Sequence, residues 1–304
     1  MDDKAKEKAE YWFGSGKLFC AETVLKIIGS AADSDLGPAL AAASGFCSGA
    51  ARTKGQCGAL SGAILALGLY GSTTETIEDV ARNRETVYEL TEELVGWFKD
   101  TYGSINCFEL TGCDFRTSEG RERFRENGVK NTCVAMCAET ADVALALLRE
   151  TGRLPELESL IRARVAPCGL SCGKCVAYGD SSLHRAARDL ADGLGDNFGG
   201  YAARFAAMNP AFKDYEGFRR LLDFLAAGTC SGCREQGCLF QACKVPGCVK
   251  EHEVDYCFEC AEFPCDRHGM PGPLAHLWRA NNEKMAEIGL EAWFEGCRKR
   301  PRYP

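Results

Sequence analysis

Nineteen of the 304 residues are cysteines, and no other feature restricts the possible folds of this chain as much. The first ten residues, MDDKAKEKAE, are charged and lack the apolar core of a secretory signal peptide. A chain of this length buries a full core without disulfide staples. In a reducing cytosol its cysteines are therefore expected to be metal ligands or redox groups. We expect a cytoplasmic protein, and so many oxidisable thiols point to an anaerobic host.

The charge balance excludes several classes of partner. The formal net charge is −7, whereas a nucleic-acid-binding protein would favour a basic face. No polybasic membrane patch is present, and the longest apolar stretch, residues 59–70, is shorter than the ~20 residues that span a bilayer. We expect no nucleic acid and no membrane insertion. The expected partners are a redox partner protein and a second copy of the chain in a homodimer.

Apolar residues recur at helical spacing, and no strand-like alternation persists in the first half. Residues 1–153 are predicted to form an antiparallel helical bundle. A linker with one helix follows at 154–165, and residues 166–304 are predicted to form a second helical domain with cysteine-rich metal-binding loops. The predicted fold is mainly α. Seven cysteines precede the linker and twelve follow it.

The stretch from Cys47 to Tyr70 carries the chemistry expected of the first domain. Gly58 and Gly62 share one helical face, which lets another backbone approach closely. Cys57 stands at the predicted helix N-terminus, where free N–H groups and the helix dipole favour a thiolate. We therefore expect a lowered pKa at Cys57. The alternative is a buried, inert cysteine before a core helix.

The first half resembles a family of redox-active proteins, C_GCAxxG_C_C, named for a CGAxxG motif between separated cysteines. Residues 57–62 read CGALSG, and FCAETVL, INCFEL and CVAMCAE flank them in the family's order. The resemblance covers about residues 1–150 and implies redox activity. Carried over by position, it implies that the reactive residues are Cys20, Cys57, Cys107 and Cys137. The further thiols Cys47 and Cys113 favour a cluster site over a single dithiol, so both join the candidate cofactor ligands, while Cys133 stays open.

The second half opens with a C-x3-C-x2-C motif formed by Cys168, Cys172 and Cys175. Gly169 and Gly173 permit the sharp turns that aim three cysteines at one ion. The same spacing occurs in the cluster loop of radical-SAM enzymes. We reject that interpretation because only about 130 residues follow, without the alternating strands and helices of the required barrel.

Two C-x2-C pairs, Cys230/Cys233 and Cys257/Cys260, are the strongest metal signal in the chain, because two such knuckles can close one tetrahedral four-sulfur site. Such a site suits zinc or iron–sulfur. The remaining candidate ligands of this half are Cys238, Cys243, Cys248 and Cys265. Eleven cysteines lie between 168 and 265. They allow two sites with three spare cysteines, or three sites whose twelfth ligand is Cys297, His252 or His268.

This half resembles a second family, the cysteine-rich DUF3795 domain. The resemblance rests on CGLSCGKC at residues 168–175 and CFECAEFPC at residues 257–265, and it covers about residues 165–295. It implies metal binding through cysteines and no assigned activity.

Two hypotheses of function follow. In the first, the chain is an iron–sulfur redox protein that serves in electron transfer or as an oxidoreductase component, with 4Fe-4S clusters held by cysteines. In the second, the first domain is a thiol–disulfide redox protein and zinc stabilises the second domain as an adaptor.

Overall fold

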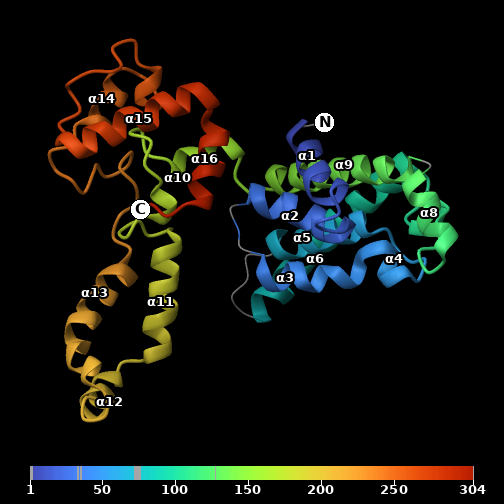
Figure 1. Ribbon diagram of the computed structural model, residues 1–304, viewed down its shortest axis with the longest axis horizontal. Helices are drawn as coiled ribbons and strands as arrows, with labels where there is room; N and C mark the ends of the chain where they lie inside the picture. Colours follow the sequence, from blue (N-terminus) through green and yellow to red (C-terminus); the bar gives the residue numbers. More distant parts are fainter. Residues whose placement is uncertain (1–2, 33, 35, 72–76, 127, 304) are drawn as a thin grey trace. The chain divides into compact units, whose positions relative to one another are not determined.

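The computed structural model describes residues 3–32, 34, 36–71, 77–126 and 128–303. The chain divides into two compact units, Met1–Glu156 and Leu157–Pro304. The described residues form helices joined by loops, and their only β-type pairings are isolated bridges (Figure 1). The prediction of a mainly α fold is confirmed.

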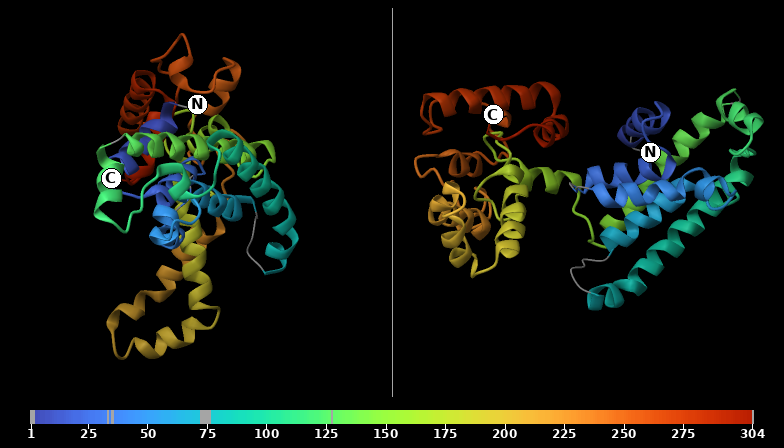
Figure 2. Two further views of the ribbon diagram at one scale, coloured as in Figure 1. Left: turned by 90° about the vertical axis from the view of Figure 1, so that its right-hand side faces the viewer. Right: turned by 60° about the horizontal axis from the view of Figure 1, so that its bottom comes forward.

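The first unit is a helical bundle whose central helices, α2, α5 and α9, pack against one another (Figure 1). The long α6 packs against α5 and is the extended helix of the right-hand view in Figure 2. A π-helical turn, Glu10–Gly14, follows α1. The helices are α1 (Asp3–Ala9), α2 (Cys20–Ala31), α3 (Gly37–Ala43), α4 (Cys47–Arg52), α5 (Gly58–Gly71), α6 (Ile77–Tyr102), α7 (Cys107–Thr111), α8 (Ser118–Glu126) and α9 (Val129–Glu150).

Close packing of α2 on α5 fixes the centre of the bundle. A Cβ added at Gly62 would lie 2.4 Å from the carbonyl oxygen of Ala21, so only glycine permits this helix separation. Around the contact lie fully buried side chains such as Leu25, Leu60 and Leu148. Their burial supplies the hydrophobic driving force for this unit, at about 25 cal/mol per Å² of apolar surface.

Helix α9 is the one described helix that is long and apolar enough to cross a membrane by length and composition. It is also one of the three central helices of the bundle, and 56% of its most apolar window is buried. Core helices of globular proteins pass the same test, so this finding is weak evidence for a membrane span.

The second unit combines an arm of paired helices with a cysteine-rich region. In the arm, α11 and α13 run side by side and α12 lies at their far end (Figures 1 and 2). Short 3₁₀ turns occur at Cys172–Lys174, Pro210–Asp214 and Cys257–Glu259. The helices are α10 (Leu157–Arg164), α11 (Ser182–Leu194), α12 (Phe198–Phe205), α13 (Tyr215–Ala227), α14 (Val245–Glu251), α15 (Gly272–Ile288) and α16 (Leu290–Lys299).

Two small apolar clusters hold this unit together. In one, Leu160 and Ile161 of α10 pack with Trp293 and Phe294 of α16, so the helix expected in the linker contributes to the core of the second unit. The other cluster surrounds the buried Trp278 and includes several cysteines. Cysteine side chains therefore occupy core positions that apolar residues fill in an ordinary domain.

Candidate functional site

A cavity of about 680 Å³ lies in the first unit, between the start of α2, the α4 turn, the start of α5 and α9. We call it the first-unit cavity. Six cysteines line it, five of them in α2, α4, α7 and α9 and one directly before α5: Cys20, Cys47, Cys57, Cys107, Cys133 and Cys137. The four cysteines that the family resemblance carries over are thus brought together at one place, although up to 117 positions separate them in the sequence. Its volume is in the range of small-molecule sites.

Local structure explains how these thiols reach the cavity. Cys20 and Cys107 are the first residues of α2 and α7, and Cys57 immediately precedes α5. The segment before α5 pairs with the segment before α7, because Cys57 N–H donates to Ile105 O at 2.7 Å and Cys107 N–H donates to Gly55 O at 2.9 Å. These two bonds bring the starts of two helices side by side, each with its cysteine.

The α4 segment is an unusual left-handed turn. Five successive residues, Ser48 to Arg52, have φ between 50° and 70°. Left-handed backbone costs about 1–2 kcal/mol for each non-glycine residue, and only Gly49 here escapes that cost. The Ser48 N–H donates to the Cys20 sulfur at 3.4 Å, so the strained turn contacts the thiols directly. Strain of this kind is typical of functional sites.

Two close contacts join the thiols of the cavity to their neighbours. A hydrogen bond between the Cys20 and Cys47 thiols raises the pKa of Cys47 well above its usual value. The Cys57 sulfur lies 3.6 Å from the Met136 sulfur. A Cβ at Gly58 would lie 2.3 Å from the Cys20 sulfur, so the first glycine of the CGALSG motif makes room for a thiol.

Burial dominates the electrostatics of the first-unit cavity. It raises the pKa of Cys57 to about 11, although the N–H groups of Ala59 and Leu60 act in the opposite direction. The expectation of a lowered pKa at Cys57 is therefore wrong, because loss of water outweighs the helix terminus. Burial also raises the pKa of Cys107 to about 11, and it raises the pKa of Cys133 and Cys137 further.

Positive side chains surround the thiols, and the described lining residues include no carboxylate. Three of the cations come from α8 and the start of α9. The basic lining residues are Arg52, Arg121, Arg125 and Lys130. The spacing of Arg121 and Arg125, one helical turn apart, was the available signal. Such a lining favours an anionic occupant.

Two cysteines of the first unit differ from the expected set. Cys113 is 1% exposed but does not line the cavity, and its thiol instead donates to Thr111 O at 3.3 Å. Cys133, which the sequence left open, does line it. Cys133 lies one helical turn before Cys137 on α9, and this spacing indicates that both side chains lie on the same face of the helix.

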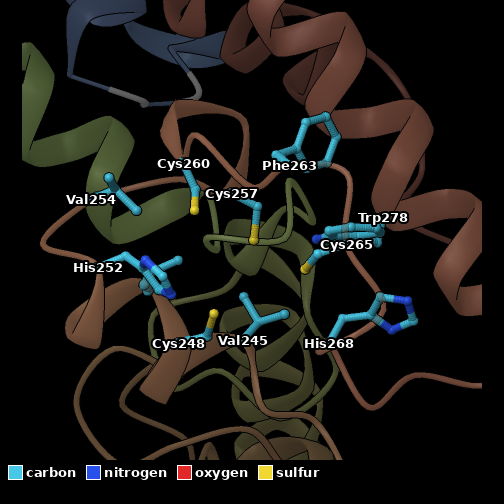
Figure 3. Close-up of a pocket in the computed structure, with 11 residues that line it drawn as sticks. Val245, Cys248, His252, Val254, Cys257, Cys260, Phe263, Cys265, His268 and Trp278 are labelled. Atoms are coloured by element: carbon cyan, nitrogen blue, oxygen red, sulfur yellow. The ribbon is translucent and has the colours of Figure 1, made fainter.

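The second unit gathers four cysteines around a cavity of about 20 Å³ (Figure 3). We call them the 248–265 cluster: Cys248, Cys257, Cys260 and Cys265. Burial, together with a smaller effect of the other three thiols of the cluster, raises the pKa of Cys257 to about 11. The four sulfurs therefore lie close enough to influence one another's ionisation.

A second group of thiols, the 168–243 cluster, consists of Cys168, Cys172, Cys233 and Cys243. A hydrogen bond between Cys172 and Cys233 raises the pKa of Cys172 and lowers the pKa of Cys233. The positive charge of Arg302 acts to lower the pKa of both thiols, which favours their charged form, although the pKa of Cys172 remains raised. Cys238 lies beside the cluster and contributes to the raised pKa of Cys243.

The C-x2-C pairs do not face each other across one site as we expected. Cys257 and Cys260 lie in the 248–265 cluster, whereas Cys233 contacts Cys172. Cys230 instead accepts from Gly232 N–H at 3.3 Å, and Cys175 lies beside the Tyr303 hydroxyl at 3.9 Å.

The candidate twelfth ligands have other neighbours. Cys297 lies in the apolar cluster of α10 and α16. His252 contacts Arg267 at 2.8 Å through Nε2, and His268 accepts from Met270 N–H at 2.9 Å through Nδ1.

Within the described ranges, no three His, Cys, Asp or Glu side chains stand, as placed, in a group that could hold a metal ion. The chemistry of the donor sets nevertheless fits soft metals, because every cluster is built from sulfur. The thiols are mostly protonated where burial raises their pKa, and metal binding would release those protons.

Two protein-family models match the chain, one within each of its two compact units. Residues 18–147 match a family model described as "Putative redox-active protein (C_GCAxxG_C_C)". Residues 164–270 match a model described as "Protein of unknown function (DUF3795)". Both resemblances drawn from the sequence are thereby confirmed. No curated protein and no solved structure matches the chain.

Proposed function

We propose that the first unit, whose residues 18–147 match the C_GCAxxG_C_C family model, binds an iron–sulfur cluster in the first-unit cavity and transfers electrons through it. The single observation that carries this proposal is the convergence of six thiols on one cavity. Iron–sulfur clusters are held by cysteine thiolates, usually four. Six thiols supply a full set with two to spare.

The size and charge of the cavity support a polynuclear occupant. Its volume of about 680 Å³ is far larger than the ~10–15 Å³ that one water molecule requires. A cluster with four thiolate ligands is anionic, and Arg52, Arg121 and Lys130 are placed to offset that charge. The potential of a cluster depends on such charges and on hydrogen bonds to its sulfurs.

Each group of this chain has a distinct task in the proposed site. A bound cluster would supply one-electron chemistry. Cys20, Cys57 and Cys107 would hold it from the starts of three helices, where backbone N–H groups can donate to thiolate sulfur. The Ser48 N–H already donates to Cys20 in this way. Apolar side chains such as Phe124 and Met136 complete the lining of the cavity.

Anaerobic purification of the full chain tests the proposal. We expect iron and acid-labile sulfide in equal amounts, with a broad visible absorption that bleaches on reduction. Cys57→Ser removes a thiol from the cavity, so it should lower the iron content and the bleachable absorbance severalfold. Cys113→Ser is the matched control, because this buried cysteine lies outside the cavity, and it should keep both.

Iron-free protein after anaerobic purification and reconstitution would contradict the cluster. Full retention of iron in the Cys57 variant would place the cluster outside the first-unit cavity.

The contact between Cys20 and Cys47 favours a second candidate function, a thiol–disulfide exchanger. The two thiols would form an S–S bond and deliver two electrons and two protons to a disulfide of a partner protein. This function predicts a titratable disulfide in colourless protein, which Cys47→Ser abolishes. Bleachable visible absorption would instead support the cluster.

A further inference from the structure

The 248–265 cluster has the features of a site for a single ion. Its cavity of about 20 Å³ accommodates one water-sized particle, whereas the first-unit cavity is more than thirty times larger by the same measure. In Figure 3 the four sulfur atoms turn toward the same space from different sides. Four thiolates around one ion form the closed tetrahedral arrangement of structural zinc sites.

We propose that the four thiolates of the 248–265 cluster bind one zinc ion that stabilises the second unit and takes no part in electron transfer. Neither family description assigns a metal to these residues. The proposal is independent of the cluster proposed for the first unit.

The neighbouring histidines favour an all-cysteine site. His252 contacts Arg267, and the ring of His268 packs at a tilt against Trp278 while its Nδ1 accepts from Met270 N–H. Figure 3 shows the His268 ring turned away from the sulfurs. Both histidines therefore have partners elsewhere, while the four thiols face the small cavity.

A buried donor completes the surroundings of the cluster. Trp278 is 3% exposed, and its indole N–H makes no hydrogen bond of normal geometry. It lies near enough to the Cys257 sulfur to oppose the rise that burial causes in the pKa of that thiol. An unpaired buried donor costs about 1–3 kcal/mol, which a thiolate acceptor would offset. Hydrogen bonds of this kind orient and tune metal ligands.

Ion binding requires the sulfurs to approach to about 2.3 Å from the metal. Three of the four belong to the segment 257–265, whose only regular element is the 3₁₀ turn Cys257–Glu259. The fourth, Cys248, is anchored on α14. A loop of this kind can close on the ion against a fixed helix. Four protons leave, and the ion and four thiolates together carry a net charge of −2.

Metal analysis of the full chain tests the proposal. Cys257→Ser and Cys265→Ser should each lose one equivalent of zinc per chain relative to wild type. Cys297→Ser is the matched control, because it replaces a buried cysteine of the same unit outside both clusters, and its zinc content should not change. Iron and sulfide should be the same in all of these proteins.

A second measurement on the wild type does not depend on the folding of any variant. Protein loaded with cobalt should show the intense ligand-field and sulfur charge-transfer bands of a tetrahedral four-thiolate site, and a chelator should lower the melting temperature of the second unit. Unchanged zinc in both cluster variants, or iron with sulfide at this site, would overturn the proposal. Cobalt bands typical of octahedral oxygen ligands would also overturn it.

Discussion

The Gly62→Ala substitution is expected to destabilise the first unit by about 3 kcal/mol, at the upper end of the usual cost of overpacking. The new Cβ would lie 2.4 Å from the carbonyl oxygen and 2.9 Å from the Cα of Ala21. Both atoms belong to the backbone of α2, which cannot yield as a flexible side chain does. The two central helices must therefore separate. Urea unfolding, with hydrogen exchange in peptides of α2 and α5, measures the loss.

Gly68→Ala is the control for this prediction. It places the same methyl group on the same helix, where nothing lies within 4 Å of the added Cβ. Since alanine is the better helix former by about 1 kcal/mol, this variant should match or exceed the wild type in stability. If the two alanine variants were equally stable, close packing of α2 on α5 would not be the reason for glycine at position 62.

This pair of substitutions also gives the CGALSG motif a physical meaning. Gly58 makes room for the sulfur of Cys20, and Gly62 makes room for the backbone that carries it. The cysteine of the motif and the start of α2 are thereby held at one cavity. We expect Gly62→Ala to weaken cofactor retention as well, because a shift of α2 moves Cys20 away from Cys57.

Much of the first unit could be predicted from the sequence. Apolar spacing indicates the helices, and the helix starts at Cys20 and Cys57 follow from the breaks before them. That these cysteines converge was an inference from the family resemblance, and the geometry of the cavity supports it. The left-handed turn from Ser48 to Arg52 could not be predicted from the sequence, because four of its five residues disfavour left-handed backbone.

The second unit shows where spacing stops being informative. A C-x2-C pair places two sulfurs close to each other, but its spacing does not reveal which other cysteines complete the site. Cys257 and Cys260 are joined by Cys248, nine positions earlier, and Cys233 by Cys172, sixty-one positions earlier. Tertiary packing decides these partners. The pKa of Cys57 likewise depends on burial, which no local motif reveals.

The Asn282→Leu substitution is expected to destabilise the second unit by about 3 kcal/mol. Asn282 on α15 is fully buried, and its Oδ1 accepts from Phe258 N–H at 3.0 Å. Its Nδ2 donates to Trp278 O at 2.9 Å. Phe258 lies between Cys257 and Cys260, so this one amide ties the C-x2-C pair to the helix that carries Trp278. Leucine has a similar volume but leaves the Phe258 N–H without its acceptor.

Glu283→Leu is the control for this prediction, because it introduces the same side chain at the neighbouring, exposed position of α15. Urea unfolding followed by tryptophan fluorescence should show a lower midpoint for Asn282→Leu and little change for Glu283→Leu. A loosened C-x2-C pair should also release zinc to a chelator faster. Equal stability and equal release rates in the two leucine variants would mean that the amide does not hold the pair in place. The position of Cys257 and Cys260 would then depend on the bound ion alone.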